Sequence, residues 1–163
     1  MNKAYLKFYN FLLRKSYFSQ IIIFYLLTFL VAIISLPLQL LAVQVAGNES
    51  AGPKGHNLLV ATLIMPIIET LVFQHWVFKL LEKTGLKKNK YLWIIIISSV
   101  LFGISHDYSL RYVVFAVSEG FVLAYTYYFY RKNTAKAFWT TTLIHCLRNG
   151  TTALILYTCE NLN

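Results

Sequence analysis

The chain has 163 residues, of which 58% are hydrophobic and only 13% are charged. Soluble domains carry about 25% charged residues and disordered chains have low hydrophobicity, so both classes are excluded. Residues 16–48 contain no Asp, Glu, Lys or Arg. Such a continuous apolar run indicates an all-α membrane protein, because the strands of membrane barrels alternate over about ten residues. The net charge is +9, and the basic residues cluster in short segments between apolar runs. This distribution is typical of membrane topology and argues against nucleic acid as a partner.

The first predicted element is an interfacial amphipathic helix, within residues 1–18, on the cytoplasmic surface of the membrane. Its polar side chains follow a four-three-four spacing and share one helical face, and they are Lys3, Lys7, Asn10 and Arg14. A cleavable signal peptide is the alternative interpretation. It is disfavoured because the apolar stretch that follows is too long and no small-residue cleavage site closes it.

The remaining chain, residues 19–159, is predicted to form a single transmembrane helical bundle of about five membrane segments. Their approximate bounds are 20–46, 58–78, 91–106, 111–130 and 137–158. Each approaches the roughly 20 residues that a bilayer requires, although the third is short. Pro37 is expected to kink the first segment. A glycine-containing loop at 47–57 and a lysine-rich loop at 79–90 connect the first three segments.

The basic residues predict the orientation of this bundle. With the N-terminus in the cytoplasm, twelve of the 15 Lys and Arg residues fall on the cytoplasmic side and two on the other. Cytoplasmic loops carry an excess of Lys and Arg. The chain is therefore predicted to be an integral membrane protein with a cytoplasmic N-terminus and the lipid bilayer as its first partner.

Ionisable residues within the apolar segments are the main functional candidates. A charge at the bilayer centre costs about 2.5–3.5 kcal/mol on insertion scales, so such residues need partners and often mark functional sites. The set comprises Glu69, His75, His106, Glu119, His145 and Arg148, with Asn149 as a polar neighbour. Of these, His75 lies near the cytoplasmic end of its segment and is expected to face lipid headgroups.

Depth along the helices brings four of these residues together. At about 1.5 Å per residue, Glu69 lies roughly 12–14 Å above the cytoplasmic boundary and His145 roughly 12 Å above it. Asn149 and His106 come out higher, at roughly 18 and 22 Å. His145 and Asn149 are four residues apart and therefore share one helical face. An acid, two imidazoles and an amide from three segments are thus predicted to meet within the membrane.

The chemistry of this set predicts a catalytic water site. Glu69 would act as general base toward water, and His106 would share the proton transfer. His145 and Asn149 would donate hydrogen bonds to an oxyanion. Peptide hydrolysis needs these functions. The alternative is that the polar side chains only hydrogen-bond helices to one another.

Three short motifs resemble those of a known family, and the resemblance covers residues 58–158 and implies that they form the catalytic core. The residues from Glu69 to Gln74 (ETLVFQ) resemble E-E-x-x-x-R, those from Phe102 to His106 (FGISH) fit F-x-x-x-H, and those from His145 to Asn149 (HCLRN) fit H-x-x-x-N. The chain thereby resembles the CPBP or Abi family of CAAX proteases and bacteriocin-processing proteins. Its members are intramembrane endopeptidases related to type II CAAX prenyl proteases.

The resemblance implies a bacterial cell-membrane protease in which Glu69 and His106 activate water, while His145 and Asn149 stabilise the oxyanion. Thr70 and Gln74 replace the second Glu and the Arg of the first motif, so that one negative and one positive charge disappear together. Thr70 is expected to orient Glu69 through a hydrogen bond. No H-E-x-x-H zinc motif occurs in the sequence, and a divalent metal such as zinc is left open as a cofactor.

Glu119 and Arg148 are predicted to pair, because both lie roughly 16 Å above the cytoplasmic side on consecutive segments and unpaired charges there are costly. The pair would either only join two helices or also support the site in place of the missing Arg. Thr70, Gln74, Glu119 and Arg148 are therefore the predicted supporting residues.

Three functions remain open at this point. The first is an intramembrane endopeptidase that hydrolyses a membrane-associated peptide or protein with water activated by Glu and His. The second is a non-enzymatic membrane immunity protein that binds a bacteriocin-like peptide in the same cavity. The third, a small ion or proton carrier, is disfavoured because five segments without an internal repeat are unusual for transporters.

Overall fold

The computed structural model describes residues 3–46, 57–85 and 89–162 of the chain. Every regular element in this part is a helix, so the predicted all-α fold class is confirmed. The helices are α1 (Lys3–Leu13), α2 (Tyr17–Ile34), α3 (Leu36–Ala46), α6 (Lys90–Ile104), α7 (Leu110–Asn133) and α8 (Ala137–Asn161). Between α3 and α6 lies one long helix, Val60–Leu81, which comprises η1 (Val60–Ile64), α4 (Met65–Glu69), η2 (Thr70–Trp76) and α5 (Val77–Leu81).

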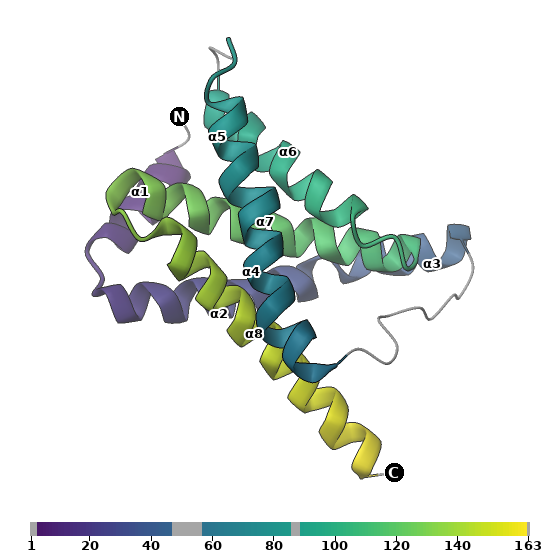
Figure 1. Ribbon diagram of the computed structural model, residues 1–163. Helices are drawn as coiled ribbons and strands as arrows, with labels where there is room; N and C mark the ends of the chain where they lie inside the picture. The colour runs from purple at the N-terminus through teal and green to yellow at the C-terminus, as the bar shows by residue number, and fades with distance from the viewer. Residues whose placement is uncertain (1–2, 47–56, 86–88, 163) are drawn as a thin grey trace.

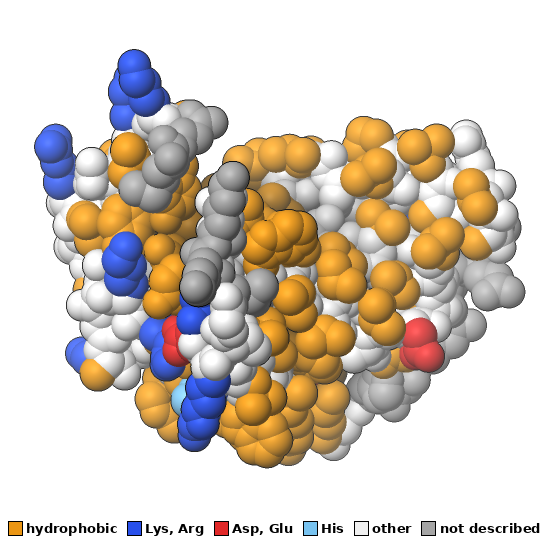
Figure 2. Space-filling view, turned by 90° about the horizontal axis from the view of Figure 1, so that it is seen from above, with side chains coloured by type: hydrophobic (Ala, Val, Ile, Leu, Met, Phe, Trp, Pro, Cys, Tyr) orange, Lys and Arg blue, Asp and Glu red, His pale blue; other side chains and the backbone are white. Residues whose placement is uncertain are grey.

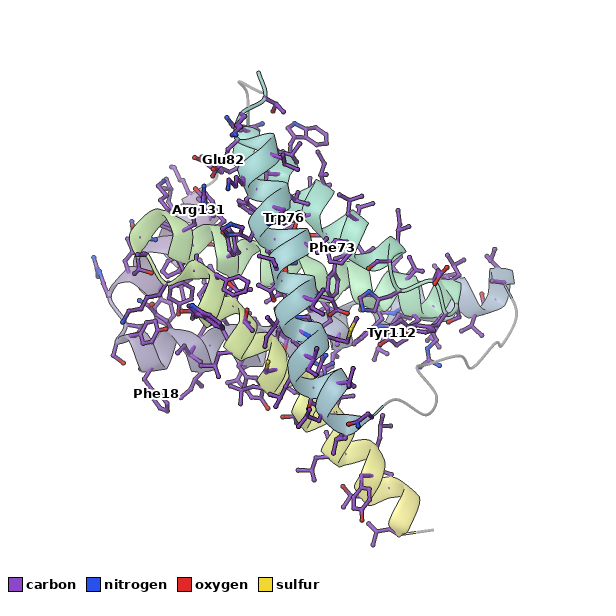
Figure 3. The ribbon with its side chains drawn as sticks, in the orientation of Figure 1. Phe18, Phe73, Trp76, Glu82, Tyr112 and Arg131 are labelled. Carbon is purple, nitrogen blue, oxygen red and sulfur yellow. The ribbon has the colours of Figure 1, made fainter. Side chains whose placement is uncertain are left out.

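Three of the described helices are long and apolar enough to cross a membrane, namely Tyr17–Ile34, Val60–Leu81 and Leu110–Asn133. Their outer surfaces carry large exposed apolar side chains, such as Leu26, Ile33 and Leu80. Figure 2 shows hydrophobic side chains over most of one face and Lys and Arg gathered toward one side of it. In Figure 3, Phe18 points away from the bundle, and Trp76 is also exposed. This apolar exterior suits lipid, whereas the count of five membrane segments stays a prediction.

The first predicted helix ends earlier than expected. α1 stops at Leu13, and α2 begins at Tyr17 after Ser16, whose hydroxyl accepts a hydrogen bond from the Ser19 backbone N–H at 3.2 Å. This serine is an N-cap, which satisfies one of the free N–H groups of the first helical turn. The predicted loops fall partly outside the described residues, which exclude 47–56 and 86–88.

The segment predicted at 20–46 with a kink at Pro37 is interrupted just before that proline and forms two helices. α2 ends at Ile34 and α3 begins at Leu36. Pro37 lies in the first turn of α3, where its missing N–H costs no hydrogen bond. The break is held by Gln39, whose amide donates hydrogen bonds to the Ala32 carbonyl and the Ser35 hydroxyl.

Helix α7 is the centre of the bundle. It contacts α2, α3, α6, α8 and the η2 part of the long helix, and Figure 1 shows the long helix crossing over it. Its Leu123, Tyr127, Phe129 and Tyr130 are almost completely buried. α1 packs against the same helix through aromatic contacts, including Tyr9 with Phe129 at 5.5 Å between ring centroids. The residues before the predicted catalytic core therefore pack directly onto it.

Small residues set the distance between α6 and α7. Ser99 and Gly103 on α6, and Ala116 and Gly120 on α7, each repeat at four-residue spacing, which lets membrane helices approach closely. A Cβ atom on Gly103 would lie 2.1 Å from Cγ2 of Val117, and one on Gly120 would lie 3.0 Å from Cδ1 of Phe102. This close crossing holds the end of α6, and with it His106, against α7.

Candidate active site

Glu69 lies in the middle of the long helix, at the point where its hydrogen-bonding pattern changes. The residues Thr70–Trp76 after it form a π-helix, which is rare and often occurs at functional sites. Proteins usually contain only a single π-turn within a helix, so seven residues are a long stretch. Glu69 is 9% exposed and faces the interior of the bundle.

Two histidines from different helices reach the Glu69 carboxylate. Its Oε1 lies 3.6 Å from Nε2 of His106, and its Oε2 lies 3.4 Å from Nε2 of His145. His145 is on α8 and is buried, whereas His106 follows the end of α6 and is partly exposed. The predicted convergence of Glu69, His106 and His145 is therefore present in the structure.

A backbone carbonyl fixes the orientation of His106. Its Nδ1 lies 2.7 Å from the carbonyl oxygen of Phe102. Because a carbonyl can only accept, Nδ1 must carry the proton, and in the neutral ring the lone pair of Nε2 then faces Glu69. The ring stacks on Tyr112 at 5.8 Å and contacts Phe102 at 4.6 Å between centroids.

Asn149 takes a different position from the other three predicted catalytic residues. It follows His145 by one turn of α8, but its Nδ2 donates a hydrogen bond to the Ala61 carbonyl at 3.1 Å. This bond joins α8 to the first turns of the long helix and fixes the amide plane. One N–H of the amide remains for another acceptor.

A cavity of about 310 Å³ adjoins these groups. Its walls are mostly apolar, and its polar lining includes His106, Glu119, His145, Arg148 and Asn149. Glu69, which contacts both imidazoles, is not among the cavity-lining residues that the structure describes. The cavity thus presents two histidines and an amide to any bound molecule, with the carboxylate beside them.

The predicted pairing of Glu119 with Arg148 is confirmed. Nε of Arg148 donates to Oε1 of Glu119 at 3.1 Å, and Nη1 donates to the hydroxyl of Thr152. The guanidinium lies 4.4 Å from the ring centroid of Phe29 and 5.6 Å from that of Phe115. Both charges are buried, so an acid on α7 and a base on α8 form a desolvated ion pair at the cavity wall.

Thr70 and Gln74 are completely buried on the π-helical segment. The expected hydrogen bond from Thr70 to Glu69 is wrong: among the described residues, the Thr70 hydroxyl and both polar atoms of the Gln74 amide have no partner. Consecutive residues of a helix do not face one another, which separates Thr70 from the Glu69 carboxylate. His75 does not simply face headgroups, because its Nδ1 lies 2.8 Å from the Tyr127 hydroxyl oxygen.

The donor set does not fit a metal ion. Among the residues that the structure describes, no group of three or more His, Cys, Asp and Glu side chains is arranged to hold one. The chemistry proposed for this site uses only side chains of the protein and water.

Sequence reasoning did not identify two aromatic residues at the site. Tyr112 stacks on His106 and lines the cavity, and Phe29 covers the Arg148 guanidinium. Ser109 gives a partial signal for Tyr112, because it is the N-cap of α7 and thereby places Tyr112 in the first turn beside His106. Phe29 has no such signal, since an aromatic residue in an apolar helix resembles any lipid-facing one.

Comparison with known proteins gives one match. Residues 54–151 match the profile of the family described as "Rce1-like: Type II CAAX prenyl endopeptidase Rce1-like". No curated protein matches the chain, and no solved structure matches it. The matched region includes Glu69, His106, His145 and Asn149, and it confirms the resemblance to the CAAX proteases. Together with its apolar helices, the match identifies the chain as an integral membrane protein of the Rce1-like family of type II CAAX prenyl endopeptidases.

Proposed function

We propose that this protein is an intramembrane endopeptidase that hydrolyses a peptide bond of a membrane-associated peptide or protein. The family points to a protease. The observation that carries the specific proposal is the contact of one buried carboxylate with two imidazoles, at 3.6 and 3.4 Å, beside a cavity. Such a group of titratable side chains in a concave site is what hydrolysis by activated water requires.

Glu69 and His106 are the proposed activators of the water. One water molecule within reach of both Oε1 of Glu69 and Nε2 of His106 would lose a proton to this pair while its oxygen bonds to the peptide carbonyl carbon. The carbon–nitrogen bond then breaks, and the same proton passes to the departing amine nitrogen. The products are a carboxylic acid and an amine, with no other reactant consumed.

His145 and Asn149 are the proposed donors to the negatively charged oxygen of the intermediate. Both line the cavity from one face of α8. Asn149 donates one N–H to Ala61, which would aim the other at the substrate. Groups fixed before the reaction stabilise developing charge most strongly. Glu119 and Arg148 are proposed to keep this part of α8 in place against α7.

The mostly apolar walls of the cavity favour a substrate segment with apolar side chains. We place the catalytic core at 58–158 within one transmembrane domain, 19–159, preceded by an interfacial helix at 1–18. The N-terminus would lie in the cytoplasm of a bacterial cell, as the basic residues predict. The family name suggests prenylated CAAX peptides as one class of substrate to test.

The test is peptide cleavage by purified protein in lipid vesicles. Fluorescence-quenched peptide libraries, with and without a farnesylated C-terminal CAAX sequence, would be compared between wild type and Glu69→Gln. Loss of a general base costs about 10²- to 10⁴-fold in rate, and the variant is expected to show that loss. Glu82→Gln is the matched control, since Glu82 pairs with Arg131 at the end of the long helix, as Figure 3 shows.

Cleavage by Glu69→Gln at the wild-type rate would rule out the proposed base. Peptide binding by wild type without any cleavage would instead identify a binding protein of the immunity type. Equal loss in Glu69→Gln and Glu82→Gln would mean that the assay reports folding rather than chemistry.

A further inference from the structure

His145 has one nitrogen in the active site and one outside it. Nε2 faces Glu69 at 3.4 Å, whereas Nδ1 is buried and has no hydrogen-bond partner among the described protein groups. For Nε2 to donate a proton to Glu69 or to an oxyanion, the neutral ring must leave Nδ1 unprotonated, and Nδ1 must then accept a hydrogen bond. This inference rests on the proposed function, because it concerns the donor role of His145.

Other unpartnered polar groups lie on α8 and on the long helix that α8 contacts. They are the hydroxyls of Thr141 and Thr142 on α8, the hydroxyl of Thr70, and both polar atoms of the Gln74 amide. The residues that carry them are at most 4% exposed. We name these four residues together with Nδ1 of His145 the buried polar cluster.

Three contacts align the two helices that carry this cluster. Along the long helix, Ala61, Glu69 and His75 contact in turn Asn149, His145 and Phe138 of α8. Residue numbers rise on one helix and fall on the other, so the helices are antiparallel. Gln74 precedes His75 by one residue and therefore lies level with the turn that ends at Thr141.

The direction in which the side chains tilt further defines how the cluster is arranged. Side chains tilt toward the N-terminus of their own helix. His145 therefore leans toward Thr141, and Gln74 leans toward Thr70 and the level of Glu69. Because the helices are antiparallel, these two tilts bring the His145 ring and the Gln74 amide toward the same level along the two helices.

Burying polar groups without hydrogen-bond partners costs free energy, so a bound molecule that supplies partners is expected in the cluster. Each buried polar group without a partner costs about 1–3 kcal/mol, and the cluster contains six such atoms. A buried water molecule typically makes about three hydrogen bonds to otherwise unsatisfied groups. The cluster offers donors and acceptors to such water on several sides. Thr70 and Gln74 stand where the first motif has its second Glu and its Arg. The groups in the cluster are therefore polar but uncharged.

We propose that the buried polar cluster holds internal water that donates a hydrogen bond to Nδ1 of His145 and so fixes the ring with its proton on Nε2. Gln74 and Thr141 are positioning residues in this arrangement, since they orient the water and do not touch the substrate. The water lies on the side of His145 away from Glu69 and is separate from the hydrolytic water.

The tautomer of His145 tests this directly. Nitrogen NMR of protein with ¹⁵N-labelled histidine distinguishes protonated from unprotonated ring nitrogens, and His145→Gln identifies the His145 signals. Wild type is expected to show a neutral ring with the proton on Nε2. Gln74→Leu combined with Thr141→Val should lose this preference and lower kcat about 10- to 100-fold with little change in KM. Thr126→Val is the matched control, because this buried hydroxyl already bonds to the Val122 carbonyl.

A wild-type His145 protonated on Nδ1 would overturn the proposal without recourse to any variant. An unchanged tautomer and kcat in the double variant, with a raised melting temperature, would also overturn it, since a dry cluster gains stability from apolar replacements. The tautomer measurement needs no cleavage. If wild type cleaves no peptide, the proposed function fails while the water cluster is still decided by NMR.

Discussion

Two buried glutamates in this protein occupy opposite electrostatic situations. Glu119 is hydrogen-bonded to Arg148 at 3.1 Å, and that guanidinium is held between Phe29 and Phe115. Glu69 is nearly as buried, yet the groups that reach it are two imidazoles at 3.6 and 3.4 Å. Arginine is always charged, whereas an imidazole gains and loses its proton near neutral pH.

This difference shows that burial alone does not distinguish a catalytic carboxyl group from a structural one. Arg148 is a permanently charged partner of Glu119. The pair therefore joins α7 to α8 and is not suited to proton exchange. Glu69 has two imidazoles at its carboxylate in place of a permanent counter-ion. A carboxyl beside two imidazoles is suited to general base chemistry, and the same three residues would be an expensive way to hold helices together.

The largest expected effect on stability comes from breaking the Glu119 pair. Glu119→Gln leaves Arg148 buried without its counter-ion and should lower the free energy of unfolding by about 3–5 kcal/mol. The double variant Glu119→Gln, Arg148→Met should recover most of that loss, because it removes both charges. Unfolding in detergent micelles measures both, and equal losses in the two variants would contradict the buried ion pair.

A smaller effect is expected at the crossing of α6 and α7, which supports His106 but not the Glu119 pair. Gly103→Ala places a methyl group against Val117 and should cost about 1–3 kcal/mol of stability. Gly150→Ala is the matched control, because nothing lies within 4 Å of its Cβ position and alanine favours the helix by about 1 kcal/mol. Thermal unfolding of the two variants should therefore shift in opposite directions.

The smallest effect concerns the ion pair outside the site. Arg131 and Glu82 form two hydrogen bonds, but Arg131 is 36% exposed at the side chain. Glu82→Gln should cost only about 0.2–1 kcal/mol, and less at high salt because solvent ions screen it. Unfolding at low and high salt measures this loss. A salt-independent loss of several kcal/mol would contradict the prediction, because it would mean that this pair behaves like the buried pair of Glu119 and Arg148.

Much of the fold and part of the site follow from local chemistry in the chain. Long uncharged apolar runs predict membrane helices, since lipid leaves backbone groups no other partner. The cost of burying charge singles out Glu69, His106, His145 and the Glu119 pair. The four-residue spacing of His145 and Asn149 places both on one face of α8, as the cavity lining bears out.

Helix packing settles what spacing along the chain leaves undetermined. Residues 69, 106 and 145 are brought into contact by the glycine crossing of α6 and α7 and by the antiparallel register of α8 with the long helix. The π-helical stretch after Glu69 and the bond from Asn149 to Ala61 have no signal in sequence periodicity. Hydrophobicity and charge act on each segment alone, whereas distances between side chains depend on how closely whole helices pack.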